Sequence, residues 1–145
     1  MNDRNARKEE EPGVSNLQTT QEIYEAFGRG DVPSILAKLS ETVDWEYGAT
    51  SSEVPWLQRG RGRDSAAAFF SSLGAIQIQQ FTPKAFLDGG NLVVVLVDIE
   101  FTVTATGKRV AEEDEVHIWR FDEQGKVARF RHRVDTEQHA LAYRG

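Results

Sequence analysis

The sequence predicts one α+β domain, in which helices cover the concave face of a curved antiparallel sheet. Two segments with helical spacing precede the first strand and a third follows it. Long alternating segments joined by turn residues then fill the C-terminal half. This order of elements is typical of α+β folds and differs from a repeating βαβ pattern. The 145 residues, 39% of them hydrophobic, suffice for a single core.

The helices are predicted from capping residues and apolar spacing. Ser15 or Asn16 can cap a first helix that ends at the glycines at 28 and 30. Asp31 can cap a short second helix, whose first turn tolerates Pro33. A third helix is expected over about 63–73, and a final short helix begins at 135 or 136 and runs to about 143.

The strands are predicted from apolar alternation and turn signals. Residues 43–47 alternate, and a loop over 48–62 follows that is long enough to form a pocket rim or lid. Residues 76–86 contain Pro83, which indicates an edge strand or a bulge. Turns at 88–91, 106–108 and 122–125 separate three further strands, at 93–104, 109–121 and 126–134.

The four-residue turn at 122–125 predicts the register of the last two strands. It sets Phe121 opposite position 126, so that His117 would face Phe130 and Glu115 would face His132. A carboxylate beside an imidazole orients the ring and raises its basicity. Glu113 is expected near the mouth of the pocket.

Composition excludes several classes of protein. The chain has no cysteine, which rules out disulfides, thiolate metal sites and cysteine nucleophiles. A net charge of −6 disfavours nucleic acid, and no apolar run reaches the length of a membrane span. Residues 1–15 are expected to be a disordered leader without a secretory signal, ahead of a domain at 16–145. A cytoplasmic location is the expectation.

Three stretches carry a resemblance to a known family: residues 23–47, 62–73 and 116–136, the last reading VHIWRFDEQGKVARFRHRVDT. The chain resembles the SnoaL-like polyketide cyclases and ketosteroid isomerases of the nuclear transport factor 2-like superfamily. The resemblance implies a cone with a cavity at one end. It also implies inward-pointing side chains on the long strands, among them Glu115, His117 and His132.

Compared with ketosteroid isomerase, the residue types of the functional positions differ. The general-base aspartate corresponds to Tyr47, the tyrosine that donates to the oxyanion to Ile23, and the protonated aspartic acid to His117. In SnoaL-like cyclases an acid/base histidine resembles His117, and limonene epoxide hydrolases have an acidic residue at the position of His132. The resemblance therefore implies a pocket but transfers none of these mechanisms.

We expect His117 and His132 to transfer protons, with His132 supported by Glu115. The alternative is that Glu115 and His132 form a structural ion pair without turnover. Two histidines and a glutamate could also hold a metal, but neither metal nor cofactor is predicted. Ligand contacts are expected from an aromatic inner face and from a tryptophan of the long loop: Trp45, Tyr47, Trp56, Phe101, Trp119 and Phe130. Among these, Tyr47 and Trp119 would hold an oxygen of the ligand.

The sequence thus predicts a small-molecule-pocket protein, an acid/base isomerase, cyclase or hydrolase for a small, partly apolar carbonyl compound. The alternative is a non-catalytic binding or dimerisation domain. Arginines alternate on the outer side of the last strand, and Val94, Leu96, Val116 and Ile118 add apolar area to the same outer face. Such a surface predicts a homodimer through the outer face of the sheet.

Overall fold

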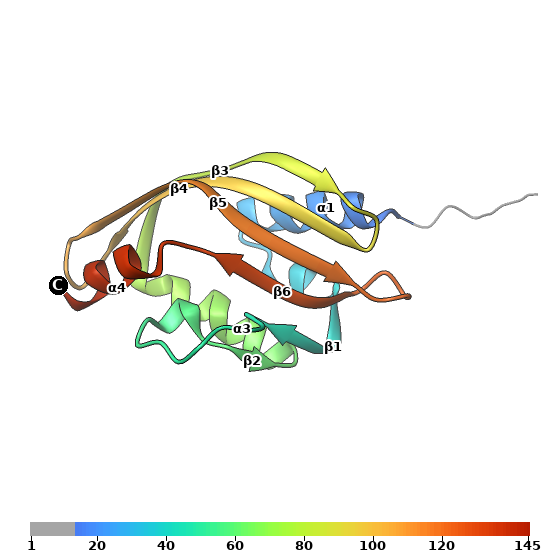
Figure 1. Ribbon diagram of the computed structural model, residues 1–145, viewed down its shortest axis with the longest axis horizontal. Helices are drawn as coiled ribbons and strands as arrows, with labels where there is room; N and C mark the ends of the chain where they lie inside the picture. Colours follow the sequence, from blue (N-terminus) through green and yellow to red (C-terminus); the bar gives the residue numbers. More distant parts are fainter. Residues whose placement is uncertain (1–13) are drawn as a thin grey trace, which may run out of the picture.

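The computed structural model describes residues 14–145, in which a curved six-stranded sheet arches over the helices α1 and α3 (Figure 1). The predicted α+β class with a covered concave face is confirmed. The leader predicted for residues 1–15 lies outside the described residues except for its last two positions. Within residues 14–145, no helix combines the length and the apolar character that a membrane crossing requires.

The helices begin at the predicted caps. Ser15 Oγ accepts a hydrogen bond from the amide of Gln18 at 3.0 Å, and the Asp31 carboxylate accepts one from the amide of Ser34 at 3.2 Å. The long loop contains a 3₁₀ turn. The helical elements are α1 (Asn16–Gly28), α2 (Val32–Leu36), η1 (Pro55–Leu57), α3 (Arg63–Ser72), η2 (Leu73–Ala75) and α4 (Thr136–Arg144).

The strands run in the order β2-β1-β6-β5-β4-β3 across the sheet. From β3 to β6 they form the predicted antiparallel meander, but β1 pairs in parallel with β6, so the sheet is mixed. The predicted edge strand is β3, which has an irregularity next to Pro83. The strands are β1 (Leu39–Trp45), β2 (Gly60–Arg61), β3 (Ile76–Asp88), β4 (Leu92–Val103), β5 (Arg109–Phe121) and β6 (Val127–Arg133).

The predicted register between β5 and β6 is wrong by two residues. The structure places His117 directly opposite His132, so Glu115 does not face His132. Two local features cause the shift. The turn pairs Asp122 with position 126, since the amide of Asp122 donates to that carbonyl at 2.9 Å, and β6 has an extra residue where the register changes next to Phe121.

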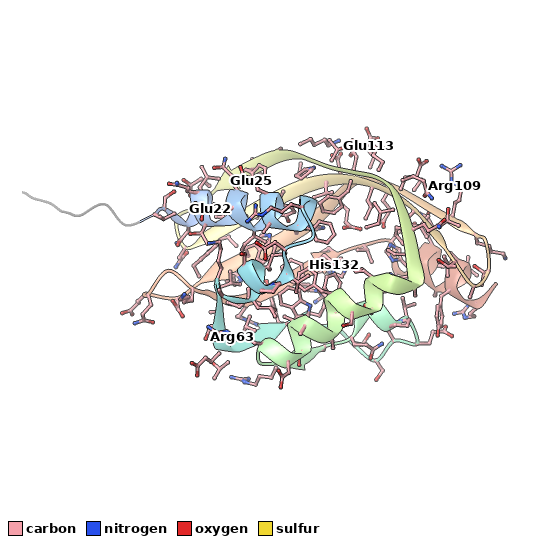
Figure 2. All side chains as sticks on the ribbon, turned by 180° about the vertical axis from the view of Figure 1, so that it is seen from behind. Glu22, Glu25, Arg63, Arg109, Glu113 and His132 are labelled. Atoms are coloured by element: carbon pink, nitrogen blue, oxygen red, sulfur yellow. The ribbon has the colours of Figure 1, made fainter. Side chains whose placement is uncertain are left out.

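A bulge in β5 turns two acidic side chains to the same face. The register with β4 shifts between Glu112 and Glu115, and Asp114 in between has a φ of +61°, in the left-handed region. Glu115 is buried and Glu112 half-buried. Glu113 points away from the interior on the outer side of the sheet, so its predicted place at the pocket mouth is wrong (Figure 2).

Aromatic rings fill the space between the sheet and the helices. Trp45 stacks on Phe130 with ring centroids 4.3 Å apart, and Trp119 lies at the same centroid distance from Phe130 and 6.3 Å from Trp45. A second group, under η1 and α4, is built around Trp56 and Phe101. These contacts fix the walls within which the polar side chains of the next section lie.

Candidate functional site

A cavity of about 70 Å³ lies between the concave face of the sheet and the helices. Its wall is mostly aromatic and aliphatic, and one carboxylate and three imidazoles interrupt it: Glu115, His117, His132 and His139. The wall includes five of the six residues predicted as ligand contacts, namely Trp45, Trp56, Phe101, Trp119 and Phe130. The predicted catalytic residues therefore come together around one hollow.

Tyr47 is the predicted contact that the structure places elsewhere. Its ring lies 4.0 Å from the guanidinium of Arg129, and its hydroxyl accepts a hydrogen bond from Arg120 Nε at 3.2 Å, on the outer side of the sheet. The cause is Glu46, whose φ of +56° interrupts the alternation that follows β1. Glu46 consequently points inward and is buried, and Tyr47 points outward.

A chain of hydrogen bonds runs from Trp119 through Tyr24 and His117 to Glu115. Trp119 Nε1 donates to the Tyr24 hydroxyl at 3.0 Å, the hydroxyl lies 2.5 Å from His117 Nδ1, and His117 Nε2 lies 2.6 Å from Glu115 Oε2. Since ionised Glu115 can only accept, His117 Nε2 donates, and Tyr24 then donates to Nδ1 of a neutral imidazole. Both nitrogens of His117 are thus occupied by protein groups.

Burial and hydrogen bonding together set the protonation states of Tyr24 and Glu115 in this chain of hydrogen bonds. Burial raises the pKa of the Tyr24 hydroxyl well above 10.0, although the hydrogen bond from Trp119 acts in the opposite direction, so Tyr24 keeps its proton at neutral pH. Burial also acts to raise the pKa of Glu115, but the hydrogen bond from His117 and the nearby His132 outweigh it and hold this pKa below 4.5. In the resemblance to ketosteroid isomerase, the tyrosine that donates to the oxyanion corresponds to Ile23, the residue next to Tyr24. Helical spacing alone does not distinguish Ile23 from Tyr24, because both are buried.

His132 pairs with Glu46 and not with the predicted Glu115. Its Nδ1 contacts Glu46 Oε2, and its backbone amide donates to Glu46 Oε1 at 2.8 Å. Burial acts to lower the pKa of His132, but the Glu46 carboxylate, followed by Glu115 and Glu112, raises it above 6.5. No residue within 14–145 forms a hydrogen bond with His132 Nε2. Figure 2 shows His132 in the interior, between the sheet and α3.

His139 is the third buried histidine, and it is not among the site residues that the sequence predicts. On α4, its Nδ1 accepts a hydrogen bond from Trp56 Nε1 at 3.0 Å, and its Nε2 lies 2.5 Å from Glu112 Oε1. Glu112 also accepts from the amide of Asp135 at 2.7 Å. The sequence offered one signal, the spacing of His139 and Ala142 on one face of a short amphipathic helix, both of which are buried.

Ligating atoms of Glu112, Glu115 and His139 lie within 4.8 Å of one another, a spacing that would suit a metal ion. The hydrogen bonds argue against it. His139 Nδ1 accepts from Trp56, so the neutral ring carries its proton on Nε2, the nitrogen beside Glu112. A protonated nitrogen has no lone pair for a metal, and His117 likewise has no free nitrogen. The donor set therefore does not fit a metal ion.

A model of the SnoaL-like domain family matches residues 20–130. Among solved structures, an NTF2-like protein of unknown function from Burkholderia pseudomallei is 30% identical in sequence, with a TM-score of 0.76. The match covers 90% of this chain and 98% of that one. A comparison with curated proteins found no match.

Two more distant structures share the fold. A Δ5-3-ketosteroid isomerase from Mycobacterium sp. is 19% identical with a TM-score of 0.66, over 86% of this chain and 97% of that one. A Mycobacterium tuberculosis protein, solved in complex with estradiol-17β-hemisuccinate, is 16% identical with a TM-score of 0.62, over the same two shares. At these identities the likeness concerns the fold alone.

Replacing Tyr24 by phenylalanine should lower the free energy of unfolding by about 1–3 kcal/mol, because Trp119 Nε1 and His117 Nδ1 would be left buried without a partner. Denaturant unfolding followed by tryptophan fluorescence measures the change. Tyr143→Phe is the matched control, since no residue within 14–145 bonds to the Tyr143 hydroxyl, and it should change stability by less than about 0.5 kcal/mol. Equal losses in both variants would contradict the proposed chain of hydrogen bonds.

The pKa shifts predict an optimum in the dependence of stability on pH. The raised pKa of His132 stabilises the fold fully below 6.5, and this contribution is lost as pH rises through the folded-state pKa. The lowered pKa of Glu115 stabilises the fold above 4.5, and this contribution is lost as pH falls through the folded-state pKa. The difference in unfolding free energy between the wild type and His132→Gln should therefore shrink above pH 6.5. A difference that stays constant from pH 5 to 9 would rule out a raised pKa of His132.

Proposed function

The chain belongs to the SnoaL-like domain family, and on this premise we propose that it is an acid/base enzyme for a small carbonyl compound, with His132 as its base. The observation that carries the proposal is the ring of His132, which lines an apolar cavity and contacts buried Glu46, and whose Nε2 has no hydrogen-bond partner among the described residues. A related fold occurs in a ketosteroid isomerase, whose name denotes a carbonyl substrate.

The chemistry proposed is removal of a proton from the carbon next to a carbonyl. Neutral His132 takes the proton on Nε2, the C–H electron pair becomes the enolate double bond, and the carbonyl electron pair moves to the oxygen. The imidazolium then returns the proton, either to the same carbon or to another one, which isomerises the compound. Glu46 stabilises the imidazolium as it forms, which is the role of the carboxylate in a histidine–carboxylate pair.

His117 has a different role from the one predicted. Because both of its nitrogens are bonded within the protein, it does not meet a substrate as the base. We assign it and Glu115 as positioning residues that hold Tyr24 and Trp119 in place along the wall. Of the three predicted catalytic residues, the proposal thus keeps His132 alone in direct contact with substrate.

The size of the cavity limits the substrate. About 70 Å³ is far below the roughly 300–1,000 Å³ of pockets that enclose drug-sized ligands. It suits a compound of a few heavy atoms, unless aromatic wall residues such as Phe69 and Phe70 move aside. The wall exposes almost only carbon atoms, so the compound should be largely apolar apart from its carbonyl group.

Exchange of carbon-bound protons in heavy water tests the proposed reaction. The protein should accelerate exchange of the α-protons of a small ketone such as cyclopentanone, followed by proton NMR. His132→Gln should reduce the catalysed rate by at least about 100-fold, a usual effect of losing a general base. Binding of the ketone without exchange would instead support the alternative, a non-catalytic binding domain.

The pH profile identifies the base. The rate should rise with pH through the pKa of His132, which lies above 6.5, because only the neutral ring accepts a proton. Glu46→Gln removes the main charge that raises this pKa, so the inflection should move to lower pH. Glu25→Gln is the control, because Glu25 is exposed on α1 (Figure 2). An inflection that stays in place in Glu46→Gln would exclude the pair as the base.

We further propose that the chain forms a homodimer through the outer face of the sheet. The half-buried side chains of Val94, Leu96, Val116 and Ile118 form an apolar strip there. Acidic Asp98 and Asp114 lie at one end of the strip, joined by Lys84, and Arg120 lies at the other end. A two-fold axis through the strip would bring opposite charges of two copies together.

The cytoplasmic location stays a prediction from the sequence.

Substitution within the strip tests the dimer. Ile118→Lys places a charge at the centre of the proposed interface and should convert a dimer into a monomer, as measured by light scattering coupled to size exclusion. Leu141→Lys is the matched control, because Leu141 is 52% exposed on α4, and it should leave the dimer intact. A monomeric wild type at concentrations up to about 100 μM would reject the proposal.

A further inference from the structure

We propose that the indole N–H of Trp45 is the hydrogen-bond donor that binds the oxygen of a neutral carbonyl ligand in the cavity. This inference rests on the proposed function and identifies the oxygen-binding group of the same site. From the sequence, Tyr47 and Trp119 are expected to hold this oxygen. Tyr47 lies on the outer side of the sheet, and Trp119 Nε1 donates to Tyr24.

The three tryptophans of the chain differ in what their N–H groups do. Trp56 Nε1 donates to His139 and Trp119 Nε1 donates to Tyr24, each at 3.0 Å. Trp45 is 1% exposed, and its Nε1 has no hydrogen-bond partner among the described residues. Buried donors are nearly always paired, since a lost hydrogen bond to water is not otherwise replaced. An unpaired N–H on a residue that lines a cavity indicates a partner supplied by a ligand.

Trp45 and the proposed base have common neighbours. The ring centroid of Phe69 lies 5.5 Å from that of Trp45 and 5.5 Å from that of His132. Phe130, directly paired with Trp45 in the sheet, lies 4.3 Å from Trp45 and 5.8 Å from His132. A compound lying against Phe69 and Phe130 can therefore direct its oxygen toward Trp45 and its neighbouring carbon toward His132.

The surrounding charges select a neutral ligand. Glu115 lines the cavity, and Glu46 and Glu112 pair with two histidines of its wall, so three carboxyl groups already lie in the wall or in contact with it. A ligand carboxylate would add a fourth negative group to an apolar enclosure, which is unfavourable. A ketone or aldehyde oxygen only accepts and the indole N–H only donates, so the two are complementary.

The indole resonances in a ¹⁵N–¹H NMR spectrum test the inference, with cyclopentanone as the ligand and cyclopentane as its counterpart without oxygen. Trp→Phe variants assign the three indole signals. Cyclopentanone should move the Trp45 proton signal downfield, because the N–H gains an acceptor, and cyclopentane should not. The signals of Trp56 and Trp119, which are already bonded, should shift far less with either compound.

Affinities provide the second measurement. Trp45→Phe keeps a ring and removes the donor, so the affinity for cyclopentanone should fall about five- to tenfold while that for cyclopentane stays within twofold. Trp56→Phe is the matched control and should leave the ratio of the two affinities unchanged. Circular dichroism of each variant shows that it is folded.

The outcomes separate this inference from the proposed function. If cyclopentanone binds and exchanges protons but the Trp45 signal does not move, the donor assignment is wrong and the acid/base proposal stands. An upfield Trp45 signal that no ketone changes would show an N–H···π contact with Phe69 or Phe70 instead, and would also overturn the assignment. If neither compound binds to the wild type, both proposals fail.

Discussion

Burying an imidazole in an apolar cavity requires a partner for its nitrogens, and this requirement organises the interior of the protein. All three histidines of the chain are buried, and each pairs with a different carboxylate. Without these partners, desolvation would favour neutral histidines with lowered pKa values and would leave buried polar atoms unsatisfied. Two of the pairs, His132–Glu46 and His139–Glu112, connect segments that are distant in sequence, whereas His117 and Glu115 lie two residues apart on β5.

Two residues with left-handed backbone conformations make this pairing possible. A positive φ at Glu46 turns its carboxylate inward where regular alternation would turn it outward. A positive φ at Asp114 accompanies the bulge that allows Glu112 and Glu115 to face the same side. Such conformations cost roughly 1 kcal/mol or more in a residue other than glycine, so the surrounding contacts must hold them in place. In both places the irregularity brings a carboxylate to a histidine.

The pairing also divides the histidines by role. His117 and His139 have protein partners on both nitrogens, which makes them fixed parts of the wall. His132 contacts Glu46 through Nδ1, its ring lines the cavity, and no residue within 14–145 bonds to its Nε2. The same buried environment thus produces two structural histidines and one that can exchange a proton. What distinguishes them is the number of occupied nitrogens, and their burial is similar.

The sequence alone determined the fold class, the helix caps at Ser15 and Asp31, the four strands of the meander and the fact that His117, His132 and Glu115 face inward. The first three follow from local periodicity and turn chemistry, which short segments encode, and the inward facing follows from strand alternation placed on the pattern of the resembled family. Tertiary structure decided which carboxylate pairs with which histidine, because a one-residue bulge or a single positive φ changes the register or the facing of every later side chain. Glu46 replaced Tyr47 in the interior for that reason, and Tyr24 and His139 joined the site from helices whose position over the sheet no local pattern specifies.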